Sequence, residues 1–198
     1  ELILLGTSLG GLVSMLLSAL VPERIQAVIM NDVGPEVNVE GLSRIRQYVC
    51  NPIAVESWDE ALALTQKLQG SEYPDFTRED WQSFTENIYH ESASGQPVLS
   101  HDPNIGYLME SSDDNAVPPD LWPLFKSMNQ RPLLLFRGET SDILSIEHVK
   151  KMQALHPEMD FFQVSKRGHA PLLSEPESLQ ILEKFLCSVK VSQVSRAV

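Results

Sequence analysis

The chain opens with an apolar run that breaks into a glycine-flanked serine and then into a helical pattern. Residues 2–5 are Leu-Ile-Leu-Leu, and positions 6–11 read Gly-Thr-Ser-Leu-Gly-Gly. A continuous apolar run is typical of a parallel strand buried on both faces. Apolar residues then recur at helical spacing over 12–20, and Pro22 marks the expected end of the helix. This order predicts a nucleophile elbow, a tight strand-to-helix turn that exposes the hydroxyl of Ser8.

The same segment could instead be an export signal or a membrane span. Residues 2–21 follow Glu1 without a basic segment, and glycines and hydroxyl residues interrupt the apolar run within positions 6–11. A spanning helix needs about 20 mostly apolar residues. We therefore expect no targeting or membrane role for this segment.

The composition narrows the classes of partner. The 198 residues are 42% hydrophobic and 21% charged, as in an ordinary globular protein, and the net charge is −12. Scattered basic residues in an acidic chain argue against nucleic acid or an anionic membrane as partner. Only Cys50 and Cys187 occur, far apart and without metal-ligand spacing, so we expect no metal, no cofactor and a reducing, cytoplasmic setting.

The pattern divides the chain into three segments, 1–34, 35–122 and 123–198. In the first, a strand over 25–30 follows the predicted helix, which makes a right-handed unit of two parallel strands. The middle segment shows helices and loops without a convincing strand. Ser57 and Thr77 are expected to cap helices there, and residues 91–120 have the composition of loop.

Strands and helices alternate again in the last segment. Apolar runs at 133–136 and 159–164 predict two more strands. Ser145 is expected to cap the helix between them, and a Ser-x-x-Glu sequence at 174–177 opens the last helix. The fold class is therefore α/β, with a mostly parallel sheet flanked by helices and a helical insertion.

Three polar residues follow three of these strands in the order Ser8, Asp142 and His169. In a parallel α/β sheet, reactive groups gather beyond the carboxyl ends of the strands. A serine hydroxyl is a weak nucleophile unless a base takes its proton and a third group orients that base. The three positions therefore predict nucleophilic catalysis on a small-molecule substrate.

With these motifs the chain resembles the C-terminal two-thirds of an α/β-hydrolase-fold enzyme that carries a helical cap. The resemblance rests on the elbow at 6–11, on Gly-Glu-Thr-Ser-Asp at 138–142 and on Gly-His-Ala-Pro at 168–171. It implies Ser8 as nucleophile, His169 as general base and then acid, and Asp142 as the acid that orients His169. It also implies the backbone N–H of Leu9 as one oxyanion donor.

Two other carboxylates are alternatives to Asp142 as the acid. Asp32 follows the preceding strand, from which a carboxylate could also reach the histidine, and Glu139 is a third option. We prefer Asp142 because of its Gly-x-x-Ser-Asp context. The other four histidines lie in segments predicted as helix or loop and are expected to be surface residues: His90, His101, His148 and His156.

The resemblance also implies that the first strands of the fold, and the loop with the second oxyanion donor, are missing. Because the loss of one such donor typically costs about 10² to 10³ in kcat, we expect little activity from this chain alone. The strand at 2–5 is expected to be an exposed sheet edge, through which the chain could form a homo-oligomer.

The leading functional hypothesis is a serine hydrolase of small to medium apolar carboxylic esters. Alternatives are a hydrolase of carbon–carbon bonds in diketone-type substrates, with the same three residues, and a non-catalytic ligand-binding protein. Some bulky residues of the middle and last segments are expected to line a substrate pocket over Ser8: Trp58, Trp81, Phe84, Tyr89, Tyr107, Met109, Trp122 and Phe125.

Overall fold

The structure, a computed structural model, describes residues 1–102, 104–106 and 119–196 of the chain. The chain divides into two compact units. Unit 1 comprises Glu1–Asn38 and Pro119–Val198, and unit 2 comprises Val39–Pro118. The limits of the expected insertion, 35–122, fall a few residues outside those of unit 2.

Unit 1 is built on a four-stranded parallel sheet in the order β1-β2-β5-β6. All four apolar runs that the sequence predicts as strands form this sheet. The strands are β1 (Leu2–Thr7), β2 (Ile25–Asn31), β5 (Leu133–Gly138) and β6 (Asp160–Val164).

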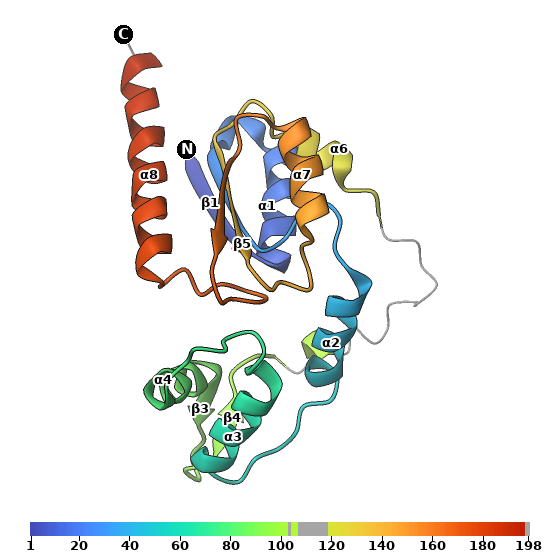
Figure 1. Cartoon of the computed structure of the whole chain (residues 1–198), viewed down its shortest axis with the longest axis vertical. Coiled ribbons are helices and arrows are strands. Elements are labelled where there is room, and N and C mark those ends of the chain that lie inside the picture. Colours follow the sequence, from blue (N-terminus) through green and yellow to red (C-terminus); the bar gives the residue numbers. More distant parts are fainter. Residues whose placement is uncertain (103, 107–118, 197–198) are drawn as a thin grey trace. The chain divides into compact units, whose positions relative to one another are not determined.

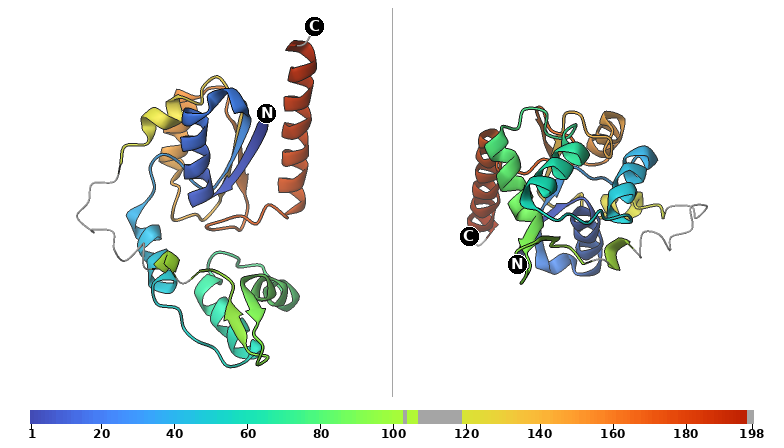
Figure 2. Two further views of the ribbon diagram at one scale, coloured as in Figure 1. Left: turned by 180° about the vertical axis from the view of Figure 1, so that it is seen from behind. Right: turned by 90° about the horizontal axis from the view of Figure 1, so that it is seen from below.

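Helices cover both faces of this sheet. Figures 1 and 2 show α1 (Leu9–Leu20) and α7 (Ile146–Leu155) on one face and α8 (Pro176–Arg196) on the other. The short helix α6 (Trp122–Lys126) lies on the α7 side, and the 3₁₀ turn Pro22–Arg24 leads into β2. The predicted cap of α7 is present, since Ser145 Oγ accepts a hydrogen bond from His148 N.

The central strands bury alternate residues in two separate apolar layers. Val28 and Met30 of β2 pack with α1, α6 and α7, whereas Ala27 and Ile29 pack with α8, and all four are at most 1% exposed. A strand buried on both faces cannot alternate apolar with polar residues, which explains the continuous apolar runs in the sequence.

β1 forms one edge of the sheet. Leu2 and Leu5 on this strand are 47% and 52% exposed, so the edge carries apolar side chains as well as a row of backbone groups. Such an edge is a template for pairing with another strand. Self-association through β1 remains a prediction.

Unit 2 contains α2 (Val39–Val49), α3 (Trp58–Gln69), α4 (Arg78–Ile88) and the hairpin of β3 (Tyr89–Glu91) with β4 (Pro97–Leu99). Both predicted caps form: Ser57 Oγ accepts from Glu60 N, and Thr77 exchanges hydrogen bonds with Asp80. The expectation of no strand in this segment is wrong, because three-residue strands are too short to show alternation.

Part of the loop expected over residues 91–120 lies outside the described residues. No helix in the described part of the chain combines the length and the apolar character that crossing a bilayer requires.

Where the chain passes from unit 1 towards unit 2, Glu36 is held by helix α7. Its carboxylate lies 3.0 Å from Lys151 Nζ and 3.2 Å from His148 Nε2. Lys151 Nζ in turn lies 5.5 Å from the ring centroid of Trp122, close to the point where the chain returns. Helix α7 therefore contacts the segment of unit 1 that precedes unit 2, at Glu36, and the segment that follows it, at Trp122.

Replacing Glu36 with Gln should lower stability in a pH-dependent way. The pKa of Glu36 is lowered chiefly by its hydrogen bond with Lys151, with smaller contributions from the charges of His148 and Lys151. A lowered pKa in the folded state stabilises the protein above the unfolded pKa, and the effect is lost as pH falls through the folded value. We expect Glu36→Gln to cost about 0.2–1 kcal/mol at pH 7 and almost nothing near pH 3.

Urea unfolding at the two pH values measures this difference. Glu183→Gln, at an exposed position on α8, is the control. A cost for Glu36→Gln that is equal at both pH values would contradict the role of its charge.

Candidate active site

Ser8 lies between β1 and α1 in an unusual backbone conformation. Its φ is 51° and its ψ is −119°, and its side chain makes no capping bond to the helix. The turn is fixed by the backbone instead, since Ser8 N donates to Asn31 O at 3.1 Å and Ser8 O accepts from Gly11 N at 2.9 Å. Because the hydroxyl of Ser8 makes no capping hydrogen bond to the helix, it can bond to a partner on another segment.

The glycines around Ser8 differ in why they are needed. A Cβ on Gly6 would lie 2.2 Å from Gly10 O, and a Cβ on Gly11 would lie 2.3 Å from a methyl carbon of Val33. A Cβ on Gly10 would meet nothing within 4 Å. Close backbone approach therefore requires Gly6, whereas Gly10 has room for a side chain.

The substitutions Gly6→Ala and Gly10→Ala should have opposite effects on stability. Gly10 lies in the first turn of α1, where alanine is a better helix former by about 0.5–1 kcal/mol. Gly6→Ala forces a backbone clash, for which we expect a loss of at least about 2 kcal/mol. Thermal unfolding of both variants measures this, and equal effects would show that the turn relaxes freely.

His169 connects the serine to a buried carboxylate. Its Nε2 lies 2.9 Å from Ser8 Oγ, and its Nδ1 lies 2.8 Å from Asp32 Oδ2. The side chain of His169 is 8% exposed and that of Asp32 is 0% exposed. A carboxylate at Nδ1 favours the tautomer with the proton on that nitrogen, which leaves Nε2 free to accept the serine proton.

Asp32 is fixed by two further hydrogen bonds. Its Oδ1 accepts from Gly138 N at 2.9 Å, and its Oδ2 accepts from Ser141 Oγ at 2.6 Å as well as from His169. Ser141 Oγ also accepts from the backbone N–H groups of Ile143 and Leu144. The turn after β5 is thus folded around the carboxylate of Asp32, the residue that follows β2.

The carboxylate that the structure places at Nδ1 of His169 is that of Asp32, the alternative to the preferred Asp142, and the choice of catalytic acid stays a prediction. Asp142 is partly exposed and lies in the turn after β5, whereas the hydrogen bond at Nδ1 of His169 goes to Asp32. The physical reason is the order of the strands. β2 lies directly beside β1, so a residue at its carboxyl end is next to the serine turn. The residue of the β5 turn that points to this carboxylate is Ser141.

Glu139, the third option for the acid, is engaged on the other side of its turn. Its Oε2 accepts from Ser165 Oγ and from Lys166 N. The hydrogen bond from the Lys166 backbone is the main cause of the lowered pKa of Glu139. Glu139 therefore ties the β5 turn to the loop after β6.

None of the contacts that the structure describes for the four other histidines is with Ser8. His148 pairs with Glu36, and His156 Nε2 lies 3.1 Å from Arg131 O. His156 is 1% exposed, so the expectation that all four are surface residues is wrong for it. His90 is on β3, and His101 lines a cavity in unit 2.

Two positioning residues were missed by the sequence analysis. Asn31 Nδ2 donates to Thr7 Oγ1 at 3.0 Å and to Pro171 O at 2.8 Å, which links the serine turn to the loop that carries His169. Ser141 orients Asp32 as described above. Asn31 directly precedes Asp32, and Ser141 directly precedes Asp142. Their position beside a candidate acid was the sequence signal that could have identified them.

Leu9, the expected oxyanion donor, is the first residue of α1. A backbone N–H at this position has no acceptor within the helix and lies at the positive end of the helix dipole. This location suits stabilisation of a negative oxygen beside Ser8.

The bulky residues expected to line a pocket over Ser8 separate into different groups. Trp81 and Phe84 pack with Tyr73 and Phe76 in unit 2. Phe125 belongs to the core of unit 1 with Trp122 beside it, and Tyr107 and Met109 lie outside the described residues. The pocket remains a prediction.

Comparisons with known proteins agree with this fold. No protein-family model matches the chain. A crystal structure of an alpha/beta hydrolase from Novosphingobium aromaticivorans is 42% identical, with a TM-score of 0.85 over 93% of this chain and 64% of that protein. The structure of an E-2-(acetamidomethylene)succinate hydrolase shares the fold, with a TM-score of 0.71 at 21% identity over 93% of this chain and 66% of that one.

A curated relative is the 3-hydroxybutyrate-oligomer hydrolase of Cupriavidus necator. It is 29% identical over 186 residues, which make up 91% of this chain and 63% of the relative. The chain thus spans somewhat less than two thirds of the length of each of these three proteins.

Proposed function

We propose that this chain, which has the α/β-hydrolase fold, carries the catalytic residues of a hydrolase that cleaves carboxylic esters through an acyl-enzyme intermediate. The observation that supports the proposal is the hydrogen-bonded series from Ser8 through His169 to Asp32. In this proposal Ser8 is the nucleophile, His169 the general base and acid, and Asp32 the residue that orients the imidazole.

The proposed reaction follows from the two distances at His169. Nε2 takes the proton of Ser8 Oγ as the oxygen attacks the ester carbonyl, and the same nitrogen then protonates the leaving alcohol. A water molecule, activated by His169, releases the acid and regenerates the serine. Asp32 stabilises the imidazolium that forms in each half of the reaction, since its carboxylate lies 2.8 Å from Nδ1.

The oxyanion that forms on the carbonyl is proposed to accept a hydrogen bond from Leu9 N–H. Stabilisation of this kind is commonly worth about 3–4 kcal/mol per donor. The name of the Cupriavidus relative makes short oligomers of 3-hydroxybutyrate the first substrates to test, beside p-nitrophenyl esters of short acids.

Fluorophosphonate labelling tests the nucleophile. Because we expect little activity from this chain alone, the incubation is prolonged. We then expect the protein to be labelled covalently and the Ser8→Ala variant to be unlabelled. Ser14→Ala, which also lies on α1, is the matched control and should keep labelling. Mass spectrometry of the labelled peptide locates the adduct. A folded protein that is not labelled, or labelling that survives Ser8→Ala, would contradict the proposal.

The choice of acid is tested by Asp32→Asn and Asp142→Asn. Loss of the carboxylate at Nδ1 should lower kcat by about 10³ to 10⁴, because the amide favours the wrong tautomer of His169. Asp142→Asn should change kcat less than about tenfold, since the Nδ1 contact is retained. Steady-state hydrolysis of p-nitrophenyl esters measures both, and the reverse ranking would restore Asp142 as the orienting acid.

A further inference from the structure

Unit 2 contains a cavity of its own, separate in its residues from the serine site. Its volume is about 520 Å³, and its walls come from α2, α3, α4 and the β3–β4 hairpin. This volume lies within the range of sites that take small organic molecules. Most of the wall is apolar, with side chains that include Val49, Leu64, Leu68, Phe84 and Ile88.

The charged residues of the wall are all basic. Arg44 and Lys67 line the cavity together with His101, and none of the described lining residues is an Asp or a Glu. This is unexpected in a chain with 27 acidic and 15 Lys or Arg residues. Arg44 also lies 3.6 Å from Glu72, which offsets its charge. Lys67 is therefore the lining cation on which the proposal below rests.

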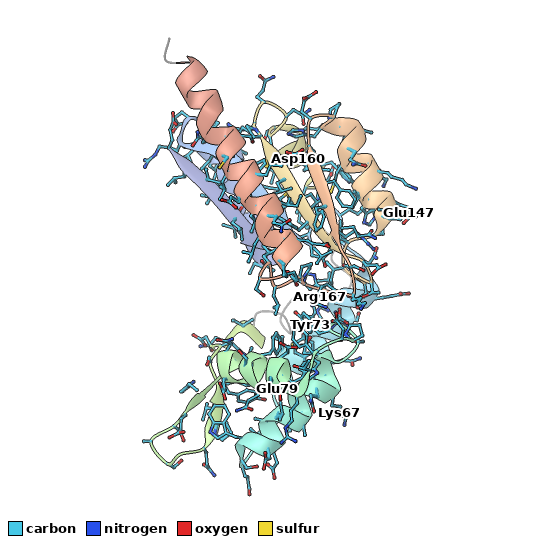
Figure 3. All side chains as sticks on the ribbon, turned by 60° about the vertical axis from the view of Figure 1, so that its left-hand side comes forward. Lys67, Tyr73, Glu79, Glu147, Asp160 and Arg167 are labelled. Carbon is cyan, nitrogen blue, oxygen red and sulfur yellow. The ribbon has the colours of Figure 1, made fainter. Side chains whose placement is uncertain are left out.

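The residues that line the cavity differ in how far they are exposed to solvent. Thr65 and Tyr89 are 2% and 5% exposed, and burial raises the pKa of the Tyr89 hydroxyl. Lys67, labelled on α3 in Figure 3, is exposed. The cavity thus combines a buried part with a cation that is in contact with solvent.

We propose that this cavity binds a small amphipathic carboxylate, such as a medium-chain monocarboxylic acid. The apolar tail would replace water along the leucine and phenylalanine side chains, where burial contributes about 25 cal/mol per Å². The carboxylate would lie near Lys67. A phosphate-rich ligand fits less well, because a polyanion requires several clustered cations and Arg44 is already beside Glu72.

Isothermal titration calorimetry with octanoate tests the proposal. The Ser8→Ala protein is used, so that no reaction at Ser8 contributes to the heat. We expect saturable binding at one site, binding of 1-octanol that is about twofold to fivefold weaker, and binding of octylammonium that is weaker still. Binding should persist in unsubstituted protein whose serine has been blocked by fluorophosphonate, which separates this proposal from the proposed function.

Two variants locate the site. Lys67→Gln should weaken octanoate binding about twofold to fivefold, as expected for an exposed charge. Leu64→Trp should fill the cavity and weaken binding at least tenfold. Lys126→Gln, at an exposed lysine on α6 of unit 1, is the matched control and should bind octanoate normally. Circular dichroism confirms that each variant is folded.

Several outcomes would overturn the proposal. Absence of octanoate binding would do so directly. Octanoate binding that is unchanged by both Lys67→Gln and Leu64→Trp would place the ligand elsewhere. Equal binding of octanoate, octanol and octylammonium would show an apolar cavity without selection for an anion.

Discussion

The candidate site depends on one fully buried carboxylate. Asp32 directly follows β2 and accepts hydrogen bonds from Gly138 at the end of β5, from Ser141 in the turn beyond and from His169 after β6. A buried carboxylate is costly unless its oxygens are satisfied, and removing one partner of such a group costs about 1–3 kcal/mol or more. The ends of three neighbouring strands are therefore tied to each other through this side chain.

Close backbone contacts make that arrangement possible. A Cβ on Gly138 would lie 2.3 Å from Gly168 O, so the end of β5 packs directly against the residue before His169. Gly6 allows the same kind of approach to Gly10 O at the serine turn. The glycines of the sequence motifs thus set the spacing of the backbone, and the polar residues that follow them gain defined positions.

The sequence was sufficient for the elements that have long patterns. The strands of unit 1 are continuous apolar runs because both faces are buried, and three helices, α3, α4 and α7, begin at a side chain that caps them. Ser8 and His169 could be placed at strand ends for the same reason. The hairpin of unit 2 could not be predicted from the sequence, since its strands Tyr89–Glu91 and Pro97–Leu99 are too short to show an alternation of apolar and polar residues.

The acid shows why a local pattern was not enough. Asp32 and Asp142 both follow apolar strands, and their distance from His169 depends on the lateral order of the strands and on how the β5 turn folds back. Neither property is encoded within a few residues of either side chain. The structure also gives Ser141, the neighbour of Asp142, a role that the sequence analysis missed. Its hydroxyl donates to the carboxylate of Asp32, which a second ionised carboxylate could not do.

The same hydrogen bonds serve the folded state and the proposed chemistry. In the resting site, the donors around Asp32 compensate its buried charge. When His169 takes the serine proton, the imidazolium becomes a cationic partner for a carboxylate that is already oriented 2.8 Å away. Because no side chain has to reorganise at that moment, the cost of ordering the site is met on folding and not during the reaction.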